Sequence, residues 1–228
     1  MNASRTARER ARAELVSEIT AAARRQLAET GAAALSMRAV SRELGMVSSA
    51  LHRYFPTRDD LLTALIVQSY DGLAGTVEAA ADGPGDPAAR WRAIAHAVRG
   101  WAFANPPEYA LIYGSPVPGY RAPADTVPSA ARVLAPLGRL LADAHAAGVL
   151  HPDPVPGEPT DDAARLRAGL NVPDLPDSAL LAAVTAWTGL FGHVSFELFG
   201  QFQNVLEERD AVFDAAVDRL GRVAGFDL

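Results

Sequence analysis

The 228-residue chain contains no cysteine, which excludes a disulfide scaffold, a thiolate zinc site and a cysteine nucleophile. It has no run of about 18 apolar residues, and its first 30 residues alternate charge with alanine rather than forming a signal peptide. Hydrophobic residues nevertheless make up 49% of the chain, which is ample for a buried core. We therefore expect a soluble cytoplasmic protein with no membrane contact.

Strand-like alternation is also absent, and apolar residues recur at helical spacing, as at Leu15, Ile19 and Leu27. The predicted fold class is all-α. The first helix is expected to end at Gly31, and the others to cover residues 36–45, 47–54, 57–81, 88–104, 126–148, 177–199 and 205–223. The stretch 105–123 predicts a short helix followed by a proline-rich loop. Six prolines between 151 and 176 predict an exposed connection there, with one helical turn near 162–168.

Catalytic and metal-binding patterns are missing as well. The five histidines are scattered, and none forms an i, i+4 pair with a second ligand. Neither a G-x-S-x-G nucleophile turn nor a phosphate-binding loop is present. We predict no enzymatic activity, no metal site and no cofactor.

Charge is distributed unevenly along the chain. Residues 1–60 carry ten arginines against seven acidic residues, whereas the remainder accounts for more than the whole net charge of −6. A basic N-terminal segment on an acidic body is expected when only one end of a protein meets a polyanion.

Two short predicted helices joined at Gly45 have the pattern of a helix-turn-helix. Glycine gives the turn its backbone freedom, and the apolar side chains at the angle between the helices are Val40, Leu44, Leu51 and Phe55. Ser48, Ser49 and His52 then lie on the opposite face of the second helix, which can enter a major groove. The pattern alone fits a pair of core helices equally well.

The residues around the helix pair favour DNA. Tyr54 and Arg58 follow the second helix, where they can bond phosphates, as can the Ser36 hydroxyl at the start of the first helix. Arginines at positions 5, 8 and 12 would form a basic stripe if the first helix extends that far. A solvated tail explains these three arginines equally well.

The stretch "LSMRAVSRELGMVSSALHRYFPTRDDLL" resembles the DNA-binding domain of the tetracycline-repressor (TetR/AcrR) family of bacterial transcription regulators. Its end matches the selective pattern L-x-R-[YH]-F-P-[ST]-[KR]-x-x-L. The resemblance covers residues 12–65. It implies a DNA-binding domain in residues 1–60 and a helical ligand-binding and dimerisation domain in residues 61–228.

The resemblance also implies roles for individual residues. Ser36, Tyr54 and Arg58 would contact phosphate, and Arg38, Ser48 and Ser49 would reach base edges. His52 stands where the family usually has a tyrosine that contacts phosphate. Val47 and Ser48 stand where serine followed by lysine or another polar residue is common. These departures predict a modest salt dependence and more apolar contact, for instance with a thymine methyl group.

The remainder of the chain resembles the C-terminal domain of an actinobacterial subgroup, in "RGWAFANPPEYALIYGSPVPGYRAP" and "AWTGLFGHVSFELFG". A Trp-His-Gly pattern marks that subgroup, but Phe191-Gly192 replaces the His-Gly pair here. The resemblance implies a homodimer through helices 177–199 and 205–223, and a largely apolar small-molecule effector. The aromatic residues predicted to line its pocket are Trp101, Tyr109, Tyr113, Trp187, Phe191 and His193.

These observations predict a ligand-responsive, DNA-binding transcriptional regulator, acting as a repressor released from a palindromic operator by a small molecule. A second hypothesis is an all-helical protein that binds or turns over a small molecule, with the N-terminal segment reduced to a protein-contact module. Sequence-preferring binding to DNA distinguishes the two.

Overall fold

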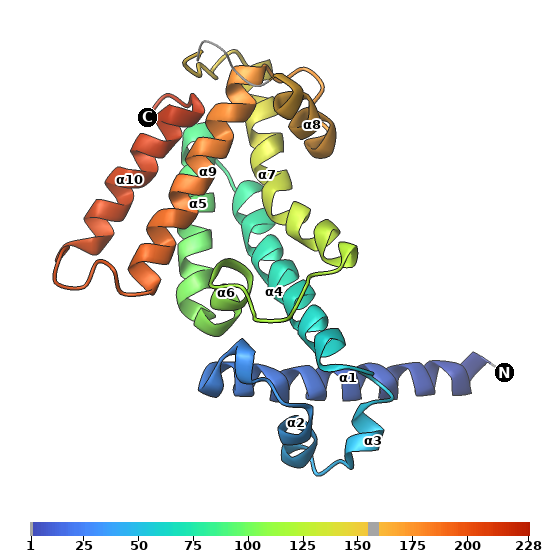
Figure 1. Ribbon diagram of the computed structural model, residues 1–228. Coiled ribbons are helices and arrows are strands. Elements are labelled where there is room, and N and C mark those ends of the chain that lie inside the picture. Colours follow the sequence, from blue (N-terminus) through green and yellow to red (C-terminus); the bar gives the residue numbers. More distant parts are fainter. Residues whose placement is uncertain (1, 155–159) are drawn as a thin grey trace. The chain divides into compact units, whose positions relative to one another are not determined.

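Helical spacing of apolar residues produces an all-helical fold in the computed structural model, which describes residues 2–154 and 160–228 (Figure 1). No strand occurs among these described residues, so the predicted fold class is confirmed. The helices are α1 (Asn2–Thr30), α2 (Met37–Glu43), α3 (Ser48–Leu51), α4 (Arg58–Ala81), α5 (Pro87–Ala104), α6 (Pro106–Tyr113), α7 (Val127–Ala146), α8 (Thr160–Leu170), α9 (Asp177–Leu198) and α10 (Arg209–Ala224), with short 3₁₀ turns at Ala32–Ala34 and Ala124–Thr126.

The chain forms two compact units. The first consists of Met1–Tyr70 and Asn105–Val127, and the second of Asp71–Ala104 and Pro128–Leu228. This division differs from a linear boundary at residue 60, because the first turns of α4 and the whole of α6 pack with the N-terminal helices. The functional division into a DNA-binding and a ligand-binding domain remains a prediction.

In the first unit, α1 packs against both α2 and α6. Its buried stripe meets the apolar faces of α2, α3 and the start of α4, and the fully buried members include Ile19, Val40, Leu51, Leu61 and Leu65. Burial of each such side chain contributes roughly 1.5–3 kcal/mol. The core therefore fixes which faces of α2 and α3 remain outside.

In the second unit, α9 packs against α10, α8 and α5. The buried Trp91 indole of α5 donates a 2.8 Å hydrogen bond to the carbonyl of Val217 on α10. Gly221 permits this approach, because a Cβ there would lie 2.7 Å from Trp91 Nε1. By length and composition α9 is apolar enough to cross a membrane, but its partners are helices of its own unit.

Three elements differ from their predicted bounds. The connection between α7 and α9 contains the three-turn α8 where one turn was expected. Regular α-helix in α3 ends at Leu51, and tighter turns carry the chain on to Tyr54. Finally, α10 begins at Arg209 rather than near 205, and turns occupy residues 201–205.

Candidate nucleic-acid interface

The start of α2 is fixed by side chains that bond to its backbone. Ser36 is the N-cap, as predicted, and its hydroxyl accepts a 3.4 Å hydrogen bond from the amide of Ala39. The Ser36 amide donates in turn to Gln26 Oε1 on α1, at 2.6 Å. Gln26 was not singled out in the sequence, because its partner lies ten residues away across a turn. Through this bond, the Gln26 side chain connects the start of α2 to α1.

The turn between α2 and α3 depends on Gly45. Its φ of +64° lies in the left-handed region, which glycine occupies at no steric cost. The amide of Met46 then donates to the carbonyl of Ser41 at 2.8 Å, which closes the C-terminal turn of α2. This geometry confirms the prediction that α2, the first helix of the helix-turn-helix, stops at Gly45.

The outward face of α3 carries the side chains predicted to meet DNA. Ser49 and His52 are exposed, Ser48 is half-buried, and Val47 is 70% exposed. Leu51 is fully buried on the opposite face. Figure 1 shows α2 and α3 together on one side of α1. The face is therefore free for a major groove, and its contacts with bases remain a prediction.

The imidazole of His52 is oriented by the end of α3. Its Nδ1 lies 2.9 Å from the carbonyl oxygen of Pro56, so Nδ1 carries the proton and donates to that oxygen. In the neutral ring, Nε2 is then an acceptor. A tyrosine hydroxyl can donate to phosphate, whereas this nitrogen cannot do so without a second proton.

Arg38 on α2 is exposed, and Tyr54 follows α3. Tyr54 is half-buried against the core of the first unit, and the Arg12 guanidinium of α1 stacks 5.3 Å from the centre of its ring. The described α1 side chains from residue 7 to Glu14 are all exposed. Arg8 and Arg12 lie one turn apart on the same face of a helix that is continuous from Asn2, whereas the side chain of Arg5 lies outside those described.

Arg58 has partners within its own unit. Its Nε donates to the carbonyl of Leu35 at 3.0 Å, and one Nη donates to the carbonyls of Ala32 and Ala33 at 2.8 and 3.1 Å. These bonds connect the start of α4 to the loop that precedes α2. A phosphate contact would have to compete with them.

The predicted effector-binding residues fall in both units. Tyr109 and Tyr113 belong to the first, where Tyr109 is fully buried and its ring centre lies 5.2 Å from that of Tyr113. Burial raises the pKa of the Tyr113 hydroxyl. Trp101, Trp187, Phe191 and His193 belong to the second unit, where Trp187 and Phe191 stack 5.0 Å apart. Their contact with an effector remains a prediction.

An all-helical fold whose short second helix presents polar side chains outward defines a helix-turn-helix DNA-binding protein. The chain belongs to the TetR family of bacterial regulatory proteins. Residues 19–65 match the model of that family's DNA-binding domain, and residues 91–220 match that of the tetracyclin repressor-like C-terminal domain.

Relatives along nearly the whole chain support this assignment. The chain is similar to the HTH-type transcriptional regulator Rv1816 of Mycobacterium tuberculosis (strain ATCC 25618 / H37Rv), at 43% identity over 217 residues, which cover 90% of each protein. An equally similar regulator, Mb1846, occurs in Mycobacterium bovis. The chain is accordingly a transcriptional regulator of the TetR family and not an enzyme.

Solved structures show the same fold. The regulatory protein SCO4313 aligns with a TM-score of 0.75 and 36% identity, covering 93% of this chain and 97% of that one. A protein from Rhodococcus sp. RHA1 aligns with a TM-score of 0.71 and 25% identity, over 91% and 94% of the two chains. PfmR from Thermus thermophilus, at 19% identity and a TM-score of 0.59 over 90% of this chain and 97% of that one, shares the fold.

Proposed function

We propose that this regulator is a homodimeric repressor that binds a near-palindromic operator and releases it when a small molecule binds the second unit. The observation that carries the proposal is the exposed polar face of α3, held outward by Gly45 and by the buried Leu51. Two such faces would enter successive major grooves about 34 Å apart.

Within each DNA-binding domain, we assign base contacts to Arg38, Ser48 and Ser49, with Val47 available to a thymine methyl group. Ser36 and Tyr54 contact phosphate. We assign Arg58 to positioning the loop before α2, because its bonds to three carbonyls hold that loop in place. Few charged side chains then touch the DNA backbone, which predicts a modest salt dependence of binding.

The surface of α9 and α10 supports pairing of two chains. Phe199 at the C-cap of α9 and Val223 on α10 are each about two-fifths exposed, which leaves apolar area for a partner. A helix that is apolar on more than one side needs cover from more than its own domain. Pairing α9 and α10 with the same helices of a second chain would give a two-fold four-helix interface.

Release of DNA requires that the effector bind one arrangement of the dimer better than the other. The aromatic side chains of the second unit, Trp101, Trp187, Phe191 and His193, are the candidate contacts. A largely apolar effector suits such residues.

The test is retardation of the DNA upstream of the regulator's own coding sequence, against a scrambled duplex of equal length. We expect two chains per shifted duplex and a clear preference for the upstream sequence. Arg38→Ala should weaken specific binding by about 1–3 kcal/mol and leave binding to the scrambled duplex unchanged.

Arg139→Ala is the matched control, because it removes the same charge from an exposed position on α7. It should leave both affinities unchanged. Absence of any sequence preference in the unsubstituted protein would contradict the proposed function and favour a protein-contact role for the first unit.

A further inference from the structure

The second unit contains an apolar groove that the aromatic residues discussed above do not line. It has a volume of about 610 Å³, within the range of pockets that hold small molecules. Its walls come from α7, α8 and α9, and Figure 1 shows the short α8 next to α7. The lining residues are Ala131, Leu134, Asp162, Arg165, Leu166, Gly169, Leu170, Leu181 and Val184.

One wall of the groove is formed by α8. This helix is anchored at its end by Arg167, whose Nε donates to the carbonyl of Leu175 at 3.0 Å and whose guanidinium also pairs with Asp177 of α9. Buried Ala163 holds its start against the rest of the unit. With α8 fixed at both ends, Leu166 and Leu170 are held facing the apolar side chains of α7 and α9.

The inner end of the groove narrows and is wholly apolar. There Leu134, Leu166 and Leu170 meet Leu141 and Leu180. A glycine on α7, Gly138, allows α8 to approach, because a Cβ there would lie 3.3 Å from Leu170 Cβ. Water has no polar partner at this end, so filling it with hydrocarbon is favourable.

The outer end is open and carries the two charged residues of the lining. Asp162 and Arg165 form an ion pair with each other along α8, and both are exposed. Their charges therefore neutralise one another without a ligand. A ligand would bury its hydrocarbon body in the groove and leave any polar group at this mouth, beside the pair.

The missing side chain of Gly169 keeps the groove open. An added Cβ at this position would meet no atom within 4 Å, although the residue lines the groove and lies within the regular helix of α8. A larger side chain could therefore enter the groove without a backbone clash.

We propose that the groove between α7, α8 and α9 is a binding site for an elongated, hydrocarbon-rich small molecule. This site is separate from the aromatic residues assigned above to the effector, so it does not depend on the proposed function. A narrow dry end and an open charged mouth favour such a ligand over a helix of another chain, which could not enter the narrow end.

The test uses the full chain and the neutral fluorophore N-phenyl-1-naphthylamine, whose emission rises in apolar sites. We expect saturable binding of one dye per chain, displaced by dodecan-1-ol. Gly169→Leu should weaken dye binding at least tenfold by filling the groove. Gly75→Leu is the matched control, because Gly75 is also an exposed helical glycine with no atom within 4 Å of an added Cβ.

Leu166→Gln is a second variant. It makes the half-exposed wall of the groove polar and should also weaken dye binding. Equal dye binding by all four proteins, or no saturable binding by the unsubstituted chain, would overturn the proposal. A change of oligomeric mass in Gly169→Leu with unaltered dye binding would also overturn it, since a second copy would then cover the groove.

Retardation of upstream DNA is measured on the same four proteins. Its failure in every protein would contradict the proposed function while leaving the dye result to decide the groove. Normal retardation with equal dye binding would reject the groove alone.

Discussion

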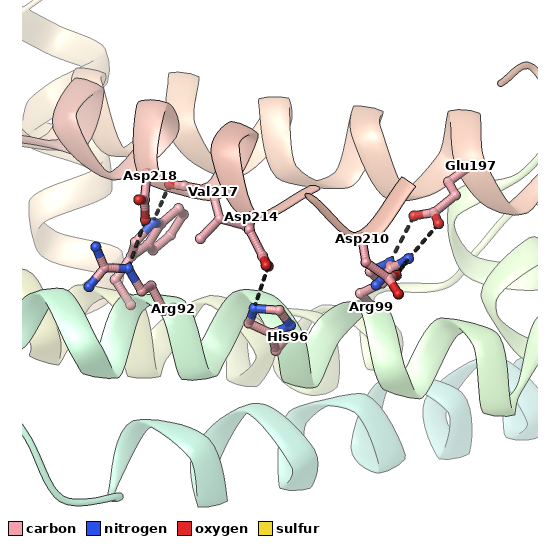
Figure 2. Close-up of polar contacts among 9 residues, drawn as sticks. Arg92, His96, Arg99, Glu197, Asp210, Asp214, Val217 and Asp218 are labelled. Carbon is pink, nitrogen blue, oxygen red and sulfur yellow. Dashed lines mark hydrogen bonds and ion pairs between the residues drawn. The ribbon is translucent and has the colours of Figure 1, made fainter. Parts of the chain in front are cut away.

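Two groups of polar side chains, one in each unit, make different kinds of contact. Around the helix-turn-helix of the first unit, Ser36, Gln26 and Arg58 bond to the backbone of loops and helix ends. In the second unit, a group on α5 bonds to side chains of other helices. Figure 2 shows the clearest case, a row of α5 side chains that faces acidic residues of α9 and α10.

This row follows from helical spacing. Arg92, His96 and Arg99 are three or four residues apart and share one face of α5. Their partners on α10 follow at intervals of four in the opposite direction: Asp218 at 2.7 Å, Asp214 at 3.1 Å and Asp210 at 2.6 Å. Arg99 also forms two bonds with Glu197 of α9, at 2.6 and 2.8 Å.

The two arrangements tolerate movement differently. A side chain bonded to backbone carbonyls fixes one loop conformation, which suits a surface that must match DNA geometry. Exposed ion pairs between helices can break and re-form with little change in free energy, which suits helices that shift when a ligand binds. Glu197 is the exception in its row, because its side chain is only 3% exposed.

The largest expected effect comes from breaking the buried pair. The hydrogen bond to Glu197 is the main cause of the raised pKa of Arg99. Arg99→Met would leave a buried carboxylate without its partner and lower the free energy of unfolding by about 3 kcal/mol. Arg92→Met, which breaks an exposed pair, should cost less than about 1 kcal/mol. Denaturant titration measures both.

A double variant sharpens this result. Replacing both partners, Arg99→Met with Glu197→Met, removes the buried charge and should recover most of the loss. Equal losses of unfolding free energy in Arg99→Met and Arg92→Met would show that burial of Glu197 does not make its ion pair more costly to break.

The next effect tests the loop contacts of the first unit. Arg58→Met removes the hydrogen bonds to Leu35, Ala32 and Ala33 and should destabilise the unit by about 2 kcal/mol. Binding to specific and scrambled DNA should fall together, because the position of the whole helix pair changes.

Arg58→Lys separates this role from a phosphate contact. Lysine keeps the charge but lacks the planar fork that reaches several carbonyls at once. If Arg58 positions the loop, lysine restores little of the stability or the DNA affinity. Full recovery of DNA affinity by lysine would assign the residue to phosphate instead.

Local features of this fold were predictable from sequence, and long-range ones were not. Ser36 and Gly45 were identified correctly because a cap or a turn involves residues only a few positions apart. The partners of Arg58 lie 23 to 26 residues away, and no pattern in the sequence links them.

The underestimated length of α8 has a compositional cause. All six prolines of the segment from 151 to 176 lie outside Thr160–Leu170, so the helix itself contains none. Because proline is frequent across the segment, the sequence analysis predicted too short a helix. The proline-free stretch has acidic residues in its first turn, which is a helix-start signal.

Tyr109 shows a second limit of sequence analysis. It is buried, but an aromatic residue at helical spacing has the same sequence pattern in a core and in a pocket.

A smaller effect is expected at the turn of the helix pair. Gly45→Ala places a Cβ in open space, so its cost comes from the left-handed backbone alone, about 1 kcal/mol. Gly75→Ala should instead stabilise the protein by up to about 1 kcal/mol, because that glycine lies inside α4. Thermal or denaturant unfolding compares them. Destabilisation of equal size in both would contradict the conformational explanation.

The smallest effect concerns the imidazole beside the buried pair. Burial lowers the pKa of His193, whose ring lies 5.0 Å from that of Phe202; nearby Glu197 raises this pKa and Arg99 lowers it further. In the unfolded chain the His193 imidazole takes up a proton near pH 6.5. In the folded chain its pKa is lower, so the unfolded state binds more protons below about pH 6.5. This contribution to stability is complete above about pH 6.5 and is lost as the pH falls through the lower folded value. His193→Gln should therefore reduce the fall in unfolding free energy between about pH 7.5 and 5.5, measured against the unsubstituted protein under the same conditions. Parallel pH dependences for the two proteins would mean that the ring titrates alike in the folded and unfolded chains.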